Sequence, residues 1–381
     1  MSGLRGAVAR ALRRVQPPAR VVDWAIAACV AFEVASGLYS FTRGTPSGAW
    51  VFWLHSTVGL TLAALVGFKL WRVRRRVTST ASWDRFTPLS VLQAAVTLAA
   101  LATGAFWVLG GNVPILAWTT LNLHVGLGLL LVPLVLYHLR GRYHSPRDVD
   151  PDRRAALKVG ALLLAGTVAW RASEAADRAL GGASRRFTGS KPTGDLYDTE
   201  TEGGGFPVTS WVADDPDPID RDSWTLAVRG LVGEELDLGY DDLGGGMDGG
   251  GGRDGGGAPV GPDTELAATL DCTSGWYTHQ RWGGVRVGDL LDAAGVEDGA
   301  RYVRFTSVTG YRWSLPIEEA EDALLATHVR GRPLSHGHGA PARLVAPGRR
   351  GFQWVKWVES VEVRERGDPM QWLVTLVSGF D

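Results

Sequence analysis

The chain has 381 residues, and its 39 basic and 40 acidic side chains give a formal net charge of −1, which argues against a nucleic-acid partner. Residues 1–180 carry 20 Lys and Arg against 8 Asp and Glu, whereas residues 181–381 carry 19 against 32. The two cysteines, Cys29 and Cys272, fall in different halves, so no disulfide within one domain is expected. The composition therefore predicts a basic membrane half followed by an acidic soluble half.

Four apolar segments in the first half are long enough to span a bilayer. They cover residues 21–41, 50–71, 88–109 and 116–139. Basic residues cluster before the first segment, between the second and third, and after the fourth, while the other two loops hold a single positive charge. The positive-inside rule then places the N-terminus in the cytoplasm. We predict a basic cytoplasmic N-terminus at 1–20 and a four-helix membrane domain at 21–145.

The membrane half contains an internal repeat with an offset near 69 residues. His55-Ser-Thr-Val-Gly59 matches His124-Val-Gly-Leu-Gly128, and Ala35-Ser-Gly37 matches Ala102-Thr-Gly104. Two copies of one helical hairpin predict a pseudo-symmetric four-helix bundle.

His55 and His124 occupy equivalent positions near the outer ends of their helices. Histidine inside a membrane span is energetically expensive, which makes both residues functional candidates. The arrangement suits ligation of one haem iron by two imidazoles, with glycines such as Gly37 and Gly104 allowing close approach of the macrocycle. The alternative is a pair of histidines that hydrogen-bond to neighbouring helices.

The bundle resembles a cytochrome b-type membrane domain. In dihaem members of that class, a second histidine follows roughly four turns after the first on the same helix. His138 holds this place after His124, whereas Lys69 holds it after His55. An ammonium group is a poor haem ligand, so the resemblance implies one b-type haem, and a second would use His138. Otherwise His138 pairs with His144 or lies at the cytoplasmic interface.

Residues 150–178 are predicted to form a fifth, short helix that resembles an internal twin-arginine export signal. Arg153-Arg154-Ala-Ala-Leu-Lys158 precedes an apolar run of 12 residues from Val159 to Trp170. The alternative is an ordinary fifth helix. Both interpretations place the linker at 179–205 and the soluble domain at 206–381 outside the cytoplasm.

Cys272 is the first candidate catalytic residue of the soluble half. It follows a short apolar segment that is typical of a strand, and it precedes a Thr-Ser-Gly turn. A free cysteine is either an inert buried thiol or a reactive thiolate. Its place at a strand exit favours the thiolate.

A second motif runs from Gly339 to Val358. It predicts a buried strand, a Pro-Gly loop carrying Arg349 and Arg350, and an aromatic-rich segment with Lys356. Arginines beside loop amides suit a phosphate group. The alternative is a solvated basic loop between two core strands.

Together, the two motifs resemble the molybdopterin-binding domain of the sulfite oxidase family, over residues 206–366. The resemblance implies an α+β fold with a mixed sheet, Mo-molybdopterin as the cofactor and Cys272 as a molybdenum ligand. It implies contacts to the cofactor from Arg343, Arg349, Arg350, Lys356, His338, Gly351 and Trp276. Tyr277 and His279 are candidates to line the substrate pocket beside Cys272.

The residues after the cysteine separate two branches of this family. Sulfite oxidases continue with Gly-Asn-Arg-Arg, whereas Cys272 is followed by Thr-Ser-Gly-Trp276. This spacing more closely resembles the bacterial periplasmic molybdenum reductase that repairs methionine sulfoxide. Arg281 and Arg312 leave open an anion site built from other directions. Because the chain ends at Asp381, we expect no immunoglobulin-like dimerisation domain. We therefore expect the soluble domain to be monomeric.

The resemblances imply a membrane-anchored molybdenum oxidoreductase that reduces an S- or N-oxide, with quinol electrons passing through the haem. The alternatives are a sulfite-type oxidase that passes electrons to quinone, and an electron-transfer or scaffold protein without a functional metal centre. The scarcity of lysine and the acidic soluble half suit a halophilic prokaryote, although a GC-rich genome also replaces Lys by Arg. The Gly-rich run 244–257 predicts a surface insertion, and Trp372 to Val377 predicts a last strand or a surface anchor.

Overall fold

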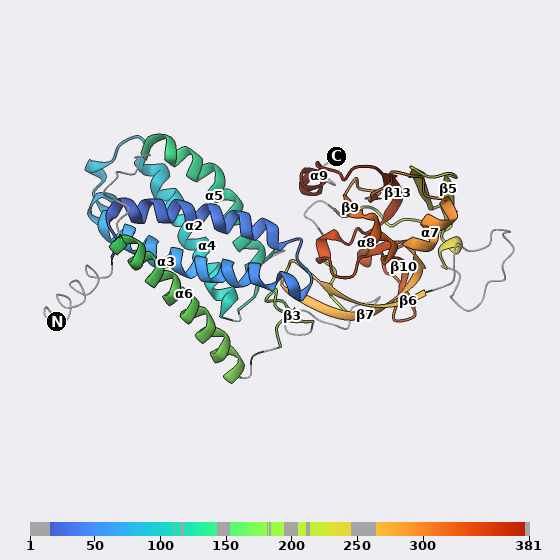
Figure 1. Ribbon diagram of the computed structural model, residues 1–381, viewed down its shortest axis with the longest axis horizontal. Coiled ribbons are helices and arrows are strands. Elements are labelled where there is room, and N and C mark those ends of the chain that lie inside the picture. Colours follow the sequence, from blue (N-terminus) through green and yellow to red (C-terminus); the bar gives the residue numbers. More distant parts are fainter. Residues whose placement is uncertain are drawn as a thin grey trace. The chain divides into compact units, whose positions relative to one another are not determined.

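Figure 1 shows a computed structural model of the chain. The structure describes residues 16–109, 111–115, 118–142, 153–180, 182, 184–193, 205–210, 214–244 and 264–377. The predicted insertion beyond Gly244 and the candidate partner His144 lie outside these residues. The chain forms two compact units with a boundary between Gly189 and Ser190. The predicted fold class is confirmed, because a helical unit precedes a unit of mixed sheets and short helices.

Among the described residues, the first unit has five helices that are long and apolar enough to cross a membrane. They are α2 (Ala19–Ser40), α3 (Ala49–Thr78), α4 (Thr87–Val108), α5 (Thr120–Arg142) and α6 (Arg153–Ala179). The connections contain the 3-10 turns η1 (Pro46–Gly48) and η2 (Thr80–Ser82) and the strands β1 (Pro114–Ile115) and β2 (Trp118–Thr119). Each of the four predicted spans contains a long helix, although the fourth becomes helical only at Thr120, after β2. Helix α3 continues through the basic run that follows its apolar part.

The outward-facing side chains of these helices are largely apolar. Leu136 and Leu164 are 62% and 66% exposed, and Trp50 and Trp71 are 50% and 53% exposed. A water-soluble protein seldom exposes so much contiguous apolar surface, whereas lipid tails solvate it well. The surface is therefore consistent with a membrane-embedded bundle.

The two predicted hairpins are present in the helix packing. Helix α2 packs on α3, where Val30 and Leu62 are buried together. Helix α4 packs on α5, where Ala100 and Leu131 are buried together. The two copies of the internal repeat thus correspond to two packed helix pairs, α2 with α3 and α4 with α5.

Helix α6 packs on α3 and is 27 residues long. Contact is close at Gly166, where an added Cβ would lie 2.6 Å from Thr61 Oγ1. The helix extends well beyond the 12-residue apolar run that predicted a short signal-like element. The role of this segment as an export signal stays a prediction.

The described part of the second unit contains two β-sheets where the sequence predicted one mixed sheet. The first has the order β11-β10-β7-β3, with β12 paired to β10 and β6 paired to β7, and the second has the order β5-β4-β13-β8-β9. Each sheet is mixed, since β3 is parallel to β7 and β13 is parallel to β4. The strands are β3 (Lys191–Pro192), β4 (Thr225–Gly230), β5 (Leu236–Gly239), β6 (Thr264–Asp271), β7 (Trp276–Arg286), β8 (Tyr302–Ser307), β9 (Arg312–Pro316), β10 (Leu324–Val329), β11 (Arg332–Pro333), β12 (Arg343–Val345) and β13 (Val358–Arg364).

Burial along the strands reflects their place in the sheets. Buried and partly exposed residues alternate along β8, as in a strand with one core face. Every residue of β10 is buried, because other strands flank it and both of its faces are covered. The helical elements of this unit are η3 (Asp241–Leu243), α7 (Val287–Ala294), α8 (Ile317–Glu321), η5 (His336–His338), η6 (Gly351–Gln353) and α9 (Gln371–Val377).

The C-terminal segment is helix α9, so the predicted last strand is wrong. The helix packs beside β9, where the Trp372 ring centroid lies 5.1 Å from that of Trp313 and 5.7 Å from that of Phe352. The side chain of Gln371 also accepts a hydrogen bond from the Ser314 N–H at 2.9 Å. These tertiary contacts override the strand propensity of the Val- and Thr-containing sequence.

Candidate functional site

Cys272 lies in the tight turn that joins β6 to β7. Its N–H donates to the Trp276 carbonyl at 2.9 Å, and its carbonyl accepts from the Gly275 N–H at 3.1 Å. Gly275 has a φ of 96°, a conformation that favours glycine. The predicted position at a strand exit is therefore confirmed, and the side chain is 7% exposed.

Two polar groups approach the sulfur of Cys272. Thr209 Oγ1 and the Ser274 N–H each lie 3.4 Å from Sγ. Both can donate a hydrogen bond to the sulfur, and such bonds stabilise a thiolate. The surroundings of Cys272 thus differ from the wholly apolar site of an inert thiol.

Arg350 fixes the Pro-Gly loop against the cysteine turn. Its buried Nη2 donates to the Cys272 carbonyl at 3.3 Å and lies 3.7 Å from Asp271 Oδ1, which also accepts from Ser190 Oγ at 2.6 Å. A Cβ on the next residue, Gly351, would lie 3.2 Å from Cys272 Cα. The structure therefore brings the two predicted motifs into direct contact.

Arg343, on β12, is the most isolated cation of this cluster. It is 4% exposed, its Nη1 donates to the His338 carbonyl at 2.9 Å, and its guanidinium lies 5.5 Å from the Trp282 ring centroid. Among the described residues, its Nε has no hydrogen-bond partner. Burial lowers the pKa of Arg343 to about 10, and the charge that opposes this effect is that of Cys272. Because a buried cation is costly unless it is paired, the site fits an anionic ligand.

Lys356 adds a second cation beside Arg343. Its Nζ donates to the Gly337 carbonyl at 2.6 Å and to Ser210 Oγ at 2.9 Å. Burial and then the Arg343 charge lower the pKa of Lys356 to about 7, with Asp214 acting in the opposite direction. A buried guanidinium that lowers the pKa of the neighbouring ammonium group indicates an electropositive pocket.

Lys356→Met should flatten the rise in thermal stability of the apoprotein above about pH 7. The pKa of Lys356 falls from 10.5 to about 7 on folding, so the unfolded chain binds more protons than the folded chain between these values. Stability therefore increases with pH across that window, by at most about 1.4 kcal/mol per pH unit. Melting curves of both proteins at several pH values test this, and parallel pH profiles would contradict it.

His338 supports the site through hydrogen bonds within the protein. Its ring lies between the Phe206 carbonyl, 2.9 Å from Nε2, and Ser335 Oγ, 2.7 Å from Nδ1. Burial lowers the pKa of His338 to about 4, so the ring is neutral at pH 7. Its carbonyl holds Arg343, and its ring packs 4.2 Å from that of Phe206, which in turn lies 6.0 Å from the Trp276 ring. His338 and Trp276 thus belong to the wall of the cluster.

Arg349 does not join the cations around Cys272. Its Nε and Nη2 form a two-point ion pair with the Glu319 carboxylate at 2.6 and 2.7 Å. Its charge is therefore neutralised within the protein. The predicted contact between Arg349 and a phosphate group stays a prediction.

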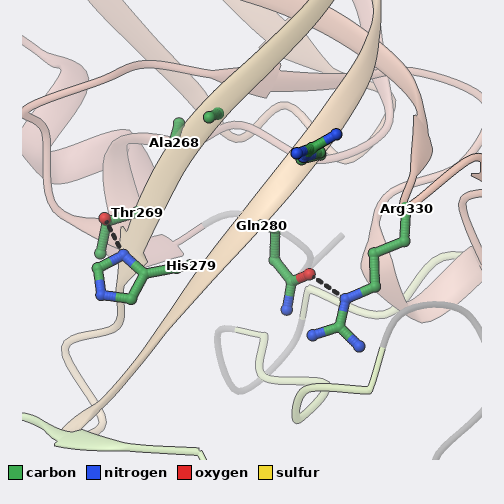
Figure 2. Close-up of a pocket in the computed structure, with 7 residues that line it drawn as sticks. Ala268, Thr269, His279, Gln280 and Arg330 are labelled. Carbon is green, nitrogen blue, oxygen red and sulfur yellow. Dashed lines mark hydrogen bonds between the residues drawn. The ribbon is translucent and has the colours of Figure 1, made fainter.

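Tyr277 and His279 lie on the more exposed face of β7, opposite the buried Trp276 and Thr278. Figure 2 shows His279 beside Thr269 of β6, with Nδ1 2.6 Å from Thr269 Oγ1. Thr269 and His279, but not Tyr277, help to line an open pocket of about 480 Å³. The structure places His279 away from the buried polar cluster, so its catalytic role and that of Tyr277 stay predictions.

The two arginines that could have formed a separate anion site are held by carboxylates. Arg281 lies 3.7 Å from Glu265, and Arg312 Nε donates to Asp368 at 2.6 Å. Neither contributes to the cluster around Cys272 in the described part of the chain. These ion pairs disfavour a sulfite-binding site formed by Arg281 and Arg312.

In the first unit, His55 of α3 and His124 of α5 lie side by side. Their ring centroids are 6.0 Å apart and the ring planes are almost perpendicular, at 89°. His55 Nδ1 lies 2.9 Å from Ser36 Oγ, and His124 Nδ1 lies 2.9 Å from the Ala100 carbonyl. Because the Nδ1 atoms contact neighbouring helices, Nε2 is the ring nitrogen suited to bind a metal on each histidine.

The glycines of the repeat accommodate these imidazoles. A Cβ at Gly37 would lie 3.5 Å from His55 Cε1, and one at Gly104 would lie 2.8 Å from His124 Cε1. The structure places the histidine rings beside Gly37 and Gly104. Close approach of a macrocycle to these glycines stays a prediction. Gly128 has no heavy atom within 4 Å of an added Cβ.

The end of the bundle that carries Lys69 and His138 breaks the symmetry of the repeat. In the second hairpin, His138 Nδ1 lies 3.0 Å from Ser90 Oγ. In the first, Lys69 Nζ lies 3.3 Å from Asp23 Oδ1, which also accepts from Arg72 at 2.8 Å. The Lys69–Asp23 ion pair thus lies where the partner of His138 in a second haem site would be needed.

Comparison with known proteins identifies the soluble unit. Residues 257–372 match the family described as "Oxidoreductase molybdopterin binding domain". The "Uncharacterized oxidoreductase YuiH" of Bacillus subtilis is 30% identical over 170 residues, which cover 44% of this chain and 78% of that protein. The chain belongs to this molybdopterin-binding oxidoreductase family. The predicted enzyme class and family are therefore confirmed.

Two relatives of named function lie in the same family. The protein-methionine-sulfoxide reductase catalytic subunit MsrP of Xanthomonas axonopodis is 29% identical, over 39% of this chain and 47% of that protein. Mitochondrial sulfite oxidase of Rattus norvegicus is 28% identical, over 42% of this chain and 33% of that protein. The chain spans less than half of either relative, so neither activity transfers to it directly.

The residues around Cys272 fit the molybdopterin that this family binds. Buried nitrogen atoms of three side chains have no hydrogen-bond partner among the described residues: Arg343 Nε, Gln353 Nε2 and Trp354 Nε1. All three are donors, and a phosphate-bearing pterin supplies acceptors. The cysteine sulfur, the cations and these free donors together match an anionic cofactor with a metal.

Sequence reasoning missed several residues of these sites. Asp271 directly precedes Cys272. A carboxylate in an otherwise apolar strand is rarely buried without a partner, and this could have marked Asp271 as part of the site. Glu33 lies within a predicted membrane span, where its charge was a comparable signal. Ser190 and Gln353 carried no signal of this kind, because their roles depend on contacts between distant segments.

Proposed function

We propose that this protein is a membrane-anchored molybdenum oxidoreductase that reduces an S- or N-oxide, such as methionine sulfoxide, by oxygen-atom transfer. Electrons come from quinol and pass singly through one b-type haem in the helical unit. The buried cluster of Cys272, Arg343, Arg350 and Lys356 is the observation that carries this proposal. The similarity to MsrP supports the substrate class.

The residues of the soluble unit have distinct roles in this reaction. Bound molybdopterin supplies a metal that exchanges two electrons with the oxygen-atom acceptor or donor. The Cys272 thiolate would bind this metal and tune its chemistry. Arg343 and Lys356 balance the negative charge of the cofactor, and Arg350 holds the turn that presents the sulfur. Trp276 and Phe206 exclude water from this side of the pocket.

The bundle offers a matching place for a haem. The ring centroids of His55 and His124 lie 6.0 Å apart, and each Nδ1 contacts a neighbouring helix. Bis-histidine ligation through Nε2 suits a low-spin haem that relays electrons. The Lys69–Asp23 ion pair supports a single haem, with His138 bonded to Ser90 instead.

Two observations favour reduction over sulfite oxidation. The turn after Cys272 lacks the two arginines with which sulfite oxidases clamp their anionic substrate. Arg281 and Arg312, the other candidates for that clamp, are each paired with a carboxylate. The distribution of basic residues supports a cytoplasmic N-terminus and a soluble unit outside the cytoplasm.

The molar ratio of molybdenum to haem iron tests this proposal. Protein purified in detergent from a host that makes molybdopterin should contain one of each. It should also oxidise a quinol with methionine sulfoxide as acceptor. Folded protein that contains haem but no molybdenum would contradict the proposal of a molybdenum enzyme. Sulfite-dependent quinone reduction would show that electrons flow from the substrate to quinone.

Arg343→Met should lower the molybdopterin content by about tenfold or more, because the variant lacks the buried guanidinium that would bind the anionic cofactor. Arg349→Met is the matched control, since Arg349 is paired with Glu319. It should retain wild-type cofactor content. The cofactor content of both variants is measured by the fluorescence of cofactor released on denaturation. Equal losses in both variants would contradict the assignment of cofactor binding to Arg343 and not to Arg349.

A further inference from the structure

Glu33 lies within the apolar helix α2 and contacts the proposed haem ligand His55. Its Oε2 lies 3.1 Å from His55 Nδ1, and its side chain is only 15% exposed. Its Oε1 is buried and has no hydrogen-bond partner among the described residues. An acidic group inside a membrane span is expensive, so its contact with a histidine calls for a functional explanation.

The internal repeat shows which group Glu33 replaces. The segment Ala35-Ser-Gly37 matches Ala102-Thr-Gly104, and the same alignment places Glu33 opposite Ala100. The Ala100 carbonyl lies 2.9 Å from Nδ1 of the other histidine, His124. Equivalent positions of the two hairpins therefore supply an oxygen atom to each imidazole. The partner is a backbone carbonyl in one hairpin and a carboxyl group in the other.

We propose that Glu33 is a positioning residue that would make His55 the stronger of the two haem ligands. This inference rests on the proposed function, in which His55 and His124 bind the iron. Ligation through Nε2 leaves the proton on Nδ1, so the ring donates a hydrogen bond and Glu33 Oε2 accepts it. The acceptor fixes the ring tautomer and orientation.

A carboxyl acceptor changes the electronic character of the ligand as well as its orientation. By drawing the Nδ1 proton toward itself, Glu33 increases the electron density on Nε2 and strengthens its bond to iron. This stabilises the ferric form over the ferrous form and lowers the haem potential. Ser36 Oγ, 2.9 Å from the same nitrogen, is a neutral second partner with a weaker effect.

The test uses full-length protein in detergent with its haem bound. Glu33→Leu removes the acceptor, and Glu33→Gln replaces it with a neutral amide of similar shape. Ser36→Ala removes the other polar partner of His55 Nδ1, and Asp23→Asn removes an acid of the same helix that is paired with Lys69. The readouts are the haem midpoint potential, the low-spin electron paramagnetic resonance signal and the affinity of the apoprotein for haem.

Glu33→Leu should raise the midpoint potential, change the low-spin signal and weaken haem binding by about 10- to 100-fold. Glu33→Gln should fall between Leu and wild type, and Ser36→Ala and Asp23→Asn should remain near wild type. Wild-type values in both Glu33 variants, or an equal effect of Ser36→Ala, would overturn the role of Glu33. A haem spectrum unchanged by His55→Ala would instead overturn the ligand assignment itself.

Discussion

Cys272→Ser should abolish oxygen-atom transfer while leaving the protein folded. A serine oxygen does not replace a soft thiolate at molybdenum, so we expect turnover to fall by at least about 100-fold. The substitution removes little volume from a turn that backbone hydrogen bonds and Arg350 hold in place. Steady-state turnover of methionine sulfoxide, together with molybdenum content and the melting temperature, measures the effect.

Cys29→Ser is the matched control, because Cys29 and Cys272 are the two cysteines of the chain and Cys29 lies on α2 of the other unit. It should keep wild-type activity and both cofactors. An active Cys272→Ser enzyme would show that the sulfur is not a ligand. Loss of activity in both variants at unchanged cofactor content would point to a general effect of cysteine replacement.

Replacing either His55 or His124 by alanine should remove the low-spin haem spectrum and stop quinol-dependent activity. Each imidazole is expected to supply one bond to the haem iron, and alanine has no nitrogen to replace it. Molybdenum content and activity with a chemical reductant should persist, because the cofactor cluster lies in the other unit. Optical spectra and parallel assays with quinol and reduced viologen distinguish these effects.

His138→Ala separates the one-haem and two-haem interpretations. His138 contacts Ser90, and its counterpart Lys69 is paired with Asp23. The variant should therefore retain the haem content and quinol-dependent activity of the wild type. Loss of half of the haem would show that His138 ligates a second one.

The sequence was most informative where a single segment carries the signal. Apolar runs predicted four of the five long helices directly, because span length and hydropathy are local properties. The turn at Cys272 was predicted for the same reason, since a short apolar strand and Thr-Ser-Gly are adjacent in the chain. For Trp372 to Val377 the sequence left a last strand and a surface anchor open, and the strand alternative is wrong, because contacts with Trp313 and Phe352 favour a helix.

The candidate site was only partly predictable, because similar side chains in one motif have different partners. Arg349 and Arg350 are adjacent, yet Glu319 neutralises the first and the second is buried against the Cys272 turn. His279 was grouped with Cys272, but strand alternation places it on the more exposed face of β7. Spacing in sequence does not reveal which of two faces a side chain occupies until the register is fixed.

By itself, the sequence determined the division into a membrane-type half and a soluble half, the repeat that pairs His55 with His124, and the family of the soluble unit. These features follow from hydropathy, periodicity and motif order, which depend only on the order of residues in the chain. Only the tertiary structure decided which cations surround Cys272 and that Glu33 contacts His55. Both depend on the approach of segments far apart in sequence, where burial and the nearest opposite charge determine what each ionisable group does.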